Sequence, residues 1–226
     1  MECGAIGCSQ GRSRIDKLQK IAEQALVDIM DNALSRLYSL IEALPSGLQD
    51  HLYRTRDMAL ELASRHNVDA QKVTLAALGH DLYRAMSGSQ LLEQAHAVGL
   101  AVHPVEQQVP ILLHGPLAAQ ALKQKDIIND PEVLEAIRWH SIACAGLGKV
   151  GLVVFLADKL DPHKAKRIPG FQRLAEVAQE SLERATVDYL TWELGLLLKR
   201  GSLLHPTSVE ARNHLMMQIA KQGGEV

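Results

Sequence analysis

The chain has 226 residues, of which 47% are hydrophobic and 22% are charged, and its formal net charge is −2 at pH 7. These values are typical of a packed globular protein and exclude a disordered or fibrous chain. The small net charge argues against a broad basic surface for neutralising nucleic-acid phosphates, so we expect no nucleic-acid partner.

The first residues of the chain are rich in glycine and serine and show no periodicity, so we predict a disordered head over residues 1–14. From Ile15 to Leu44 hydrophobic residues recur every three or four positions, which predicts an amphipathic helix. We assign residues 15–45 to this N-terminal helix. Its polar face has little cationic bias, which favours packing over membrane anchoring.

The main domain is predicted over residues 46–222 and begins with a helix that ends near His66. Ser46 and Gln49 have the spacing of a capping box for this helix. His51 and Arg54 are three residues apart, so they share one helix face.

A third helix is predicted from about Asp69 to Ala85, and it carries the adjacent pair His80 and Asp81. A shorter helix is expected over residues 89–99.

Prolines divide the next part of the chain. Gly115 and Pro116 favour the start of a helix, which places His114 at its mouth. Asp130 is the predicted cap of another helix, which ends at His140.

The hydrophobic run at residues 150–157 fits a buried strand or a buried helix, and we expect a helix because nothing nearby offers a partner strand. Helical spacing continues over residues 169–200. Thr207 and Glu210 have the spacing of a capping box for the last helix. The lack of hairpin signals completes the prediction of an all-α fold.

The cysteines Cys3, Cys8 and Cys144 are odd in number and lack the spacing of a disulfide framework, which favours a reducing compartment. The N-terminal residues lack the hydrophobic core of a signal peptide, and residues 150–157 are too few to span a bilayer. We therefore expect a cytoplasmic protein without a membrane partner.

The His80-Asp81 pair raises a chemical question, because burying a carboxylate costs several kcal/mol unless it is paired or bound to a cation. A metal ion beside the helix resolves this difficulty if other helices complete its ligand shell. His51 and Asp158 are the candidates for that role. Three or four mixed nitrogen and oxygen ligands suit iron, manganese or zinc.

Four further residues are candidates for contacts around this centre. His114 and His140 either bind a second ion or contact substrate phosphate. For Arg54 and Lys159, a solvated charge and a phosphate contact are equally open interpretations. We expect no role for the remaining isolated histidines, His66, His96, His103 and His214.

Several segments together resemble the HD-domain metal-dependent phosphohydrolases, and more narrowly the YqeK-type symmetrical bis(5'-nucleosyl)-tetraphosphatases. The likeness runs from about Leu48 to Met216. It rests on "HLYRTRDMALELA", "AALGHDLYRAM", "ILLHGPLAAQAL", "VLEAIRWHS", "LADKLDP" and "LLHPTSVEARNHLM".

The resemblance implies an all-helical HD-domain bundle that hydrolyses diadenosine tetraphosphate to two ADP. It implies an iron-type centre, with manganese or zinc as alternatives and with one or two ions. The metal ligands it implies are His51, His80, Asp81 and Asp158. The catalytic residues it implies are Asp81, His114 and His140. The substrate-binding residues it implies are Arg54, His114, His140, Ser141 and Lys159.

The chain departs from this family's pattern at two places near the expected substrate. A threonine and a following glycine are replaced in His140-Ser141-Ile142-Ala143, and a Glu-Pro followed by arginine is replaced in Asp161-Pro162-His163-Lys164. Two alternatives therefore stay open. One is another HD hydrolase acting on nucleotides or cyclic dinucleotides, and the other is a non-catalytic nucleotide-binding protein that retains a structural metal. The N-terminal helix is expected to cover the site or to join two subunits as a homodimer.

Overall fold

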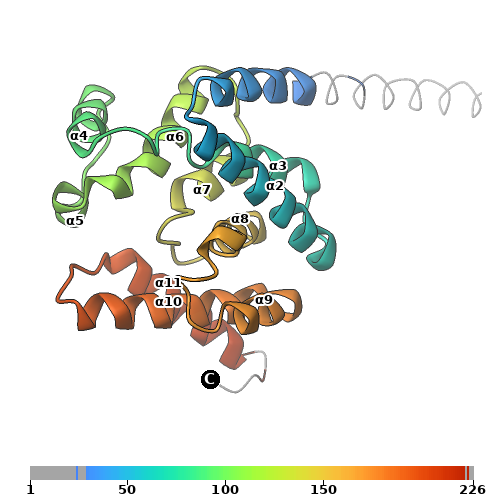
Figure 1. Ribbon diagram of the computed structural model, residues 1–226, viewed down its shortest axis with the longest axis vertical. Coiled ribbons are helices and arrows are strands. Elements are labelled where there is room, and N and C mark those ends of the chain that lie inside the picture. Colours follow the sequence, from blue (N-terminus) through green and yellow to red (C-terminus); the bar gives the residue numbers. More distant parts are fainter. Residues whose placement is uncertain (1–23, 25–28, 222, 224–226) are drawn as a thin grey trace, which may run out of the picture.

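The computed structural model describes residue 24, residues 29–221 and residue 223, and every regular element within these residues is a helix (Figure 1). The all-α fold expected from the sequence is confirmed. After a helix at residues 29–42, the elements are α2 (Ser46–His66), α3 (Ala70–Gly79), α4 (Gly88–Ala97), α5 (Pro104–Gln108), η1 (Pro110–Leu113), α6 (His114–Gln124), α7 (Pro131–Trp139), α8 (Lys149–Lys159), η2 (Pro162–Lys164), α9 (Phe171–Glu180), α10 (Leu182–Lys199) and α11 (Pro206–Lys221). None of the helices described is long and apolar enough to cross a membrane.

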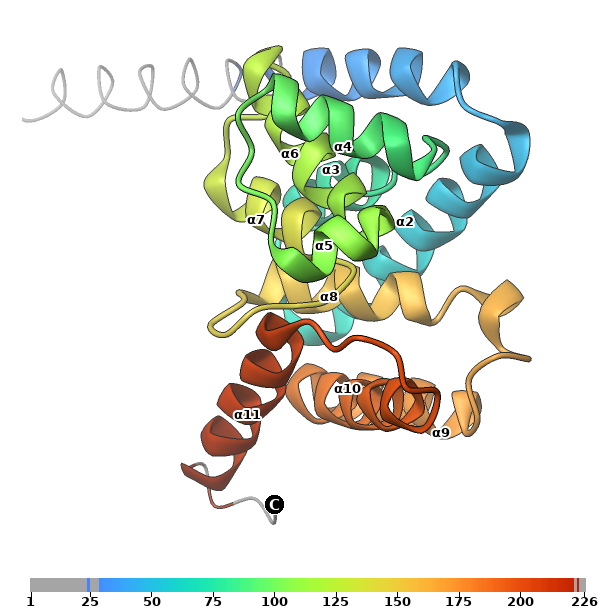
Figure 2. The same ribbon diagram turned by 90° about the vertical axis from the view of Figure 1, so that its left-hand side faces the viewer.

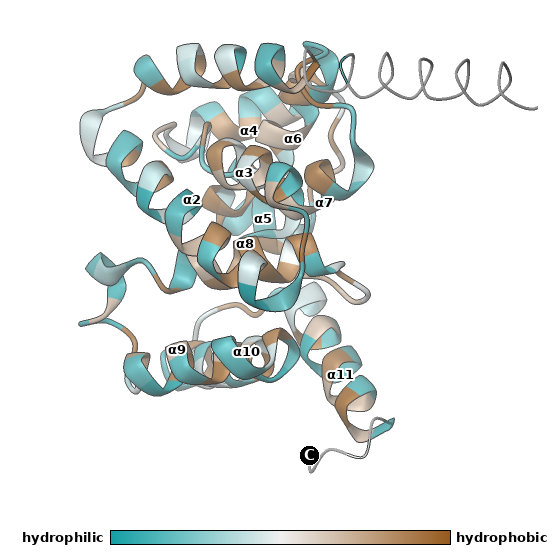
Figure 3. Cartoon of the chain, turned by 90° about the vertical axis from the view of Figure 1, so that its right-hand side faces the viewer, coloured by the Kyte–Doolittle hydropathy of each residue, from teal (hydrophilic) through white to brown (hydrophobic). Residues whose placement is uncertain are grey.

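The helix at residues 29–42 is the described part of the predicted N-terminal helix, whereas the predicted disordered head lies outside the described residues. In Figure 3 hydrophobic and hydrophilic residues alternate along this helix. The buried side chains are spaced four residues apart: Ala33, Leu37 and Ile41. The Arg36 guanidinium donates hydrogen bonds to the carbonyl oxygens of Lys125 and Asp126, at 2.5 and 2.7 Å. The helix therefore packs on its own chain, and a homodimer through it stays a prediction.

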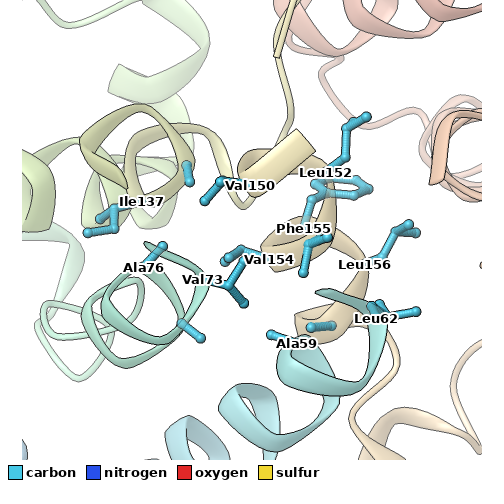
Figure 4. Close-up of a cluster of buried hydrophobic side chains, with 14 of the residues drawn as sticks. Ala59, Leu62, Val73, Ala76, Ile137, Val150, Leu152, Val154, Phe155 and Leu156 are labelled. Carbon is cyan, nitrogen blue, oxygen red and sulfur yellow. The ribbon is translucent and has the colours of Figure 1, made fainter. Parts of the chain in front are cut away.

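Helix α8 lies at the centre of the core (Figures 1 and 4). Every residue from Val150 to Lys159 is buried, and helices α2, α3, α7 and α10 all pack against α8. A helix that is surrounded in this way is hydrophobic all round, which explains why its periodicity looked ambiguous. Figure 4 shows core side chains from four helices meeting here: Ala59, Leu62, Val73, Ala76, Ile137, Val150, Leu152, Val154, Phe155 and Leu156.

Helix α3 ends earlier than predicted, and this difference positions the site. It stops at Gly79, so His80 and Asp81 lie in the turn that follows it rather than inside a helix. A Cβ atom on Gly79 would lie 2.9 Å from Cδ1 of Ile137, so α3 and α7 approach each other closely here. The backbone of His80 still has helical dihedral angles, with φ −63° and ψ −38°, so its side chain keeps the direction of a helical residue.

Both predicted capping boxes are wrong. Helix α2 is preceded by Pro45, and Nε2 of Gln49 donates instead to the carbonyl oxygen of Leu44, at 2.7 Å. Helix α11 begins at Pro206, and Nδ1 of His205 accepts from the Thr207 backbone N–H at 3.3 Å. A proline beside each start fixes φ and determines where the helix begins.

The helical stretch expected over residues 169–200 consists of two helices, α9 and α10. The chain is extended at Ser181, with φ −152° and ψ 120°, and its side chain accepts a hydrogen bond from the Arg184 backbone N–H. Serine is a favoured N-cap, so the same residue ends one helix and starts the next. This break allows α10 to turn and pack against α8.

Candidate metal centre

The residues expected to bind a metal come together from three separate parts of the chain. His51 lies on α2, His80 and Asp81 follow α3, and Asp158 lies on the last turn of α8. Nε2 of His51 is 3.1 Å from Oδ1 of Asp158 and 3.6 Å from Oδ2 of Asp81. Nε2 of His80 is 3.7 Å from Oδ2 of Asp81 and 3.8 Å from Oδ1 of Asp158. Ligand atoms at these separations can surround one ion.

Three imidazoles at the site are oriented in the same way. His80, His114 and His140 each place Nδ1 against a backbone carbonyl oxygen three residues earlier in the chain. Because a carbonyl only accepts, these contacts assign the ring proton to Nδ1 and leave a lone pair on Nε2. The carbonyl groups belong to Ala77, Ile111 and Ile137.

His51 is held differently, by two residues from distant parts of the chain. Nδ1 of His51 lies 2.6 Å from Oδ2 of Asp161, and Arg54 donates two hydrogen bonds to the same carboxylate, at 2.9 and 3.0 Å. Burial alone would raise the pKa of Asp161, but the hydrogen bonds from Arg54 and His51 hold it well below its usual range. An ionised Asp161 therefore directs Nε2 of His51 toward the centre.

Nε2 of His80 shows that the centre fits a cation. This atom is buried and has no hydrogen-bond partner among the residues that the structure describes, and burial lowers the pKa of His80 to about 3. A neutral ring with its proton on Nδ1 offers only a lone pair at Nε2, and the neighbouring oxygens of Asp81 and Asp158 are also acceptors. A divalent cation among these atoms satisfies all of them, and mixed imidazole and carboxylate donors suit transition metals.

The two carboxylates at the centre are ionised. Burial alone would raise the pKa of Asp158, but Lys159 and His51 hold it well below its usual range. Burial likewise opposes ionisation of Asp81, yet the surrounding imidazoles hold its pKa well below normal. The centre therefore offers two negative charges beside ring nitrogens that a cation can bind in place of their protons, which is the donor set of a divalent metal site.

His114 and His140 form a second part of the site. Their Nε2 atoms are 2.9 Å apart, and they lie 2.9 and 3.3 Å from Oδ1 of Asp81. Two ring nitrogens this close need a proton or a cation between them. His80, Asp81 and His140 also place ligand atoms close enough together to hold one ion. Ser141 Oγ is 3.3 Å from Nε2 of His114.

A cavity of about 400 Å3 opens beside these residues, and its walls are rich in cations. Of the residues predicted to bind substrate, His114, His140, Ser141 and Lys159 line the cavity. Lys159 is also part of the support of the centre, since its Nζ donates to Asp158 Oδ2 at 2.9 Å and to the His140 carbonyl oxygen at 3.1 Å. Lys164 contacts Asp158 from the other side.

The structure does not bring Arg54 to the cavity, because its guanidinium is turned to Asp161. The sequence analysis assigned no role to Asp161 or to three of the cations that line the cavity, Arg84, Lys164 and Arg167. Arg84 follows the HD pair within the "GHDLYR" segment, so its position was a usable signal. Lys164 and Arg167 follow the second departure from the family pattern, and nothing in their spacing marks them.

Comparison with known proteins agrees with this arrangement. A family model described as HD domain matches residues 48–163. This range includes the proposed ligands His51, His80, Asp81 and Asp158, together with His114 and His140. The chain is 26% identical over 175 residues to the symmetrical bis(5'-nucleosyl)-tetraphosphatase of Halalkalibacterium halodurans, covering 76% of this chain and 92% of that protein. It is 24% identical over 166 residues to the protein of the same name from Bacillus subtilis, covering 74% and 88%.

A solved structure shares the fold. It is described as a predicted HD superfamily hydrolase involved in NAD metabolism, from Clostridium acetobutylicum, and it superposes with a TM-score of 0.74. The two sequences are 25% identical, and the match covers 85% of this chain and 97% of that one. The predicted domain boundaries, at residues 46 and 222, stay predictions, since the family model ends at residue 163. The chain belongs to the HD domain family, and the expectation of an all-helical, metal-dependent hydrolase of this family is confirmed.

Proposed function

We propose that the chain hydrolyses diadenosine tetraphosphate symmetrically and releases two molecules of ADP. The observation that carries this proposal is the buried, unpartnered Nε2 of His80, which faces two ionised carboxylates beside a cation-lined cavity. The names of the relatives support the same substrate, and this chain covers most of their length. A metal centre next to clustered cations is suited to a highly charged polyphosphate.

The ligands in this proposal are His51, His80, Asp81 and Asp158, with iron as the resident ion and manganese or zinc as alternatives. A divalent ion held there would supply Lewis-acid polarisation of a phosphoryl oxygen and a lowered pKa for an attacking water. Two overlapping sets of ligand atoms, one including His51 and one including His140, leave room for one or two ions.

The other residues bind and orient the substrate in this proposal. Lys159, Lys164, Arg84 and Arg167 surround the cavity and offset the negative charge of the polyphosphate. Such fixed charges act strongly where water is largely excluded.

Proton transfer is proposed for His114, His140 and Asp81. The Nε2 atoms of both histidines share Oδ1 of Asp81 as a neighbour, so a proton between the rings has a stabilising anion beside it. Ser141 Oγ, at 3.1 Å from Nε2 of His140, can receive or pass on that proton. These groups line the cavity, within reach of a phosphoryl oxygen.

The two departures from the family pattern keep suitable chemistry at the site, which argues against a non-catalytic protein. Ser141 retains a hydroxyl beside both histidines. Asp161, in place of glutamate, still accepts from His51 and Arg54. Lys164, in place of arginine, still presents a cation to the cavity.

Product identification tests the proposal. Purified protein is loaded with Fe(II), Mn(II) or Zn(II), incubated with diadenosine tetraphosphate, and the nucleotides are separated by chromatography. ADP as the only nucleotide product supports the proposal. ATP with AMP, or rapid turnover of mononucleotides or cyclic dinucleotides without turnover of diadenosine tetraphosphate, contradicts it. Bound ADP without any turnover would support the non-catalytic alternative.

Three further properties rest on the sequence and remain proposals. We propose a cytoplasmic protein whose partner is the small nucleotide rather than nucleic acid. We also propose a homodimer joined through the N-terminal helix. Sedimentation of the full chain, compared with a variant carrying Ile29→Glu on the exposed side of that helix, tests the dimer.

A further inference from the structure

Symmetrical cleavage places a geometric requirement on the site. The bond that breaks lies in the middle of the tetraphosphate, so an ADP half extends away from the metal centre on each side. The protein must therefore accommodate one nucleoside on either side of the reacting phosphates. One nucleoside pocket cannot meet this requirement.

The main cavity has hydrophobic walls from two different parts of the fold. Ile111 and Leu112 belong to η1, which leads into α6, whereas Tyr189 and Trp192 belong to α10. Figures 1 and 2 both show α6 above α8 and α10 below it, so these walls come from opposite sides of the helix that carries Asp158.

A second hollow of about 170 Å3 adjoins the main cavity at the α10 side. The two share Ile168, Tyr189 and Trp192 as lining residues, so they adjoin at the Trp192 side chain. The second hollow differs in chemistry from the first. Its remaining walls are Pro169, Gly170 and Leu174 with one cation, Arg173, and one anion, Asp188, whereas four lysines and arginines line the main cavity.

We infer that this second hollow receives the base of the second nucleoside, with Trp192 as the aromatic surface on which the base stacks. The inference rests on the proposed function and names the residues that select a dinucleotide over a mononucleotide. The charged phosphates stay with the cations of the main cavity, and an uncharged base suits the less charged hollow beyond them. Every nucleobase has a face that stacks on an aromatic ring.

Trp192 is held in a fixed relation to the metal centre. Lys159, which donates to Asp158, places Nζ 5.7 Å from the centre of the Tyr189 ring. The Tyr189 and Trp192 ring centroids are 5.5 Å apart. The Tyr189 hydroxyl donates to Glu193 Oε1 at 3.0 Å, which fixes that ring in turn. A rigid aromatic surface binds a base with little loss of side-chain entropy.

The residues that build this hollow lie outside the part of the chain that matches the HD family model. That match ends at residue 163, whereas the hollow is formed by residues 168–192. The metal centre and the substrate preference are thus carried by different segments. This division explains how a shared metal centre can serve a particular dinucleotide.

The test compares two ligands that share the tetraphosphate but differ in the number of nucleosides. One is diadenosine tetraphosphate, and the other is adenosine 5'-tetraphosphate. KM is measured for hydrolysis, and Kd is measured by calorimetry with a methylene-bridged, uncleavable form of the dinucleotide. Trp192→Ala is expected to weaken binding of the dinucleotide about tenfold, the effect of losing one base stacking contact. Trp192→Phe is expected to restore most of it.

One substitution can block the hollow without touching the metal centre, and a substitution at the neighbouring residue is its control. Arg173 and Gln172 are neighbours at the start of α9 and both are exposed, but only Arg173 lines the hollow. Arg173→Trp is expected to lower the ratio of the affinity for the dinucleotide to the affinity for adenosine tetraphosphate. Gln172→Trp should leave this ratio unchanged.

The outcomes separate the inference from the function on which it rests. If the wild-type protein forms ADP from diadenosine tetraphosphate and the ratio falls in Trp192→Ala and Arg173→Trp, the inference is supported. If ADP forms but both ligands weaken equally in these variants, or neither weakens, the inference is overturned and the proposed function stands. If no ADP forms, the proposed function is overturned and the inference with it.

Discussion

Nδ1 of His51 lies 2.6 Å from Oδ2 of Asp161, and this contact determines which nitrogen of the ring faces the metal centre. Removing such a supporting carboxylate from a metal-binding histidine typically costs about 10–100-fold in metal affinity or activity. Asp161→Ala is therefore expected to lower the affinity for the metal by about that factor, as measured by competition with a chelator.

Asp57→Ala is the matched control, because Asp57 is an exposed carboxylate on the same helix as His51 and pairs only with Arg56. Its metal affinity should equal that of the wild type. An unchanged affinity in Asp161→Ala would show that His51 does not depend on this contact.

Arg54 is predicted to stabilise the fold in a pH-dependent way. It holds the pKa of Asp161 well below its usual range, so the pair stabilises the folded state while the unfolded-state carboxyl is ionised, above about pH 4. Arg54→Ala should lower the free energy of unfolding at pH 7 by about 1 kcal/mol, since the guanidinium is partly exposed. The loss should be unchanged at pH 5 and should shrink at pH 3, where the unfolded-state carboxyl takes up a proton.

Denaturant titrations of the wild type, Arg54→Ala and Arg56→Ala at pH 7, 5 and 3 check this prediction. Arg56 pairs with exposed Asp57 and serves as the control of similar charge and exposure. A loss in Arg54→Ala that stays constant down to pH 3 would contradict the assigned role.

Gly115 is predicted to be required for the position of His140. A Cβ atom there would lie 2.9 Å from the Ile137 carbonyl oxygen and 3.1 Å from Cε1 of His140, and a backbone oxygen cannot move aside easily. Gly115→Ala should destabilise the protein by about 1–3 kcal/mol and lower activity. Gly195 in α10 has nothing within 4 Å of the same added atom, so Gly195→Ala should stabilise the protein by up to about 1 kcal/mol.

Thermal unfolding of both alanine variants measures these opposite effects. Equal melting temperatures for the two variants would show that the packing around Gly115 is less tight than the distances indicate.

Much of the fold could be predicted because its signals are local. Asp130 accepts from the backbone N–H groups of Glu132 and Val133, as its position before Pro131 predicted. Residues 150–157 were correctly expected to be helical, and the central place of α8 follows from their hydrophobicity. The end of α3 at Gly79 was not predictable in this way, because His80 keeps helical dihedral angles and no proline marks the boundary.

The candidate site was predictable where the residue type reveals the chemistry. Histidine and aspartate in apolar segments indicated a metal, and the structure brings His51, His80, Asp81 and Asp158 together. The remaining supporting and cavity-lining residues, such as Asp161, Lys164 and Arg167, were not predictable, because charged residues are common on surfaces. Arg54 was assigned to phosphate because its partner Asp161 lies 107 residues away in the sequence.

The central claim is that the buried imidazoles and carboxylates hold a divalent metal ion, and elemental analysis of purified protein tests it most directly. The wild type and His96→Ala, which changes an exposed histidine away from the cavity, should contain at least one equivalent of iron, manganese or zinc. Asp81→Ala should contain less than about a tenth of that amount, because it removes a charged ligand from the centre. Equal metal content in Asp81→Ala and the wild type would contradict the account.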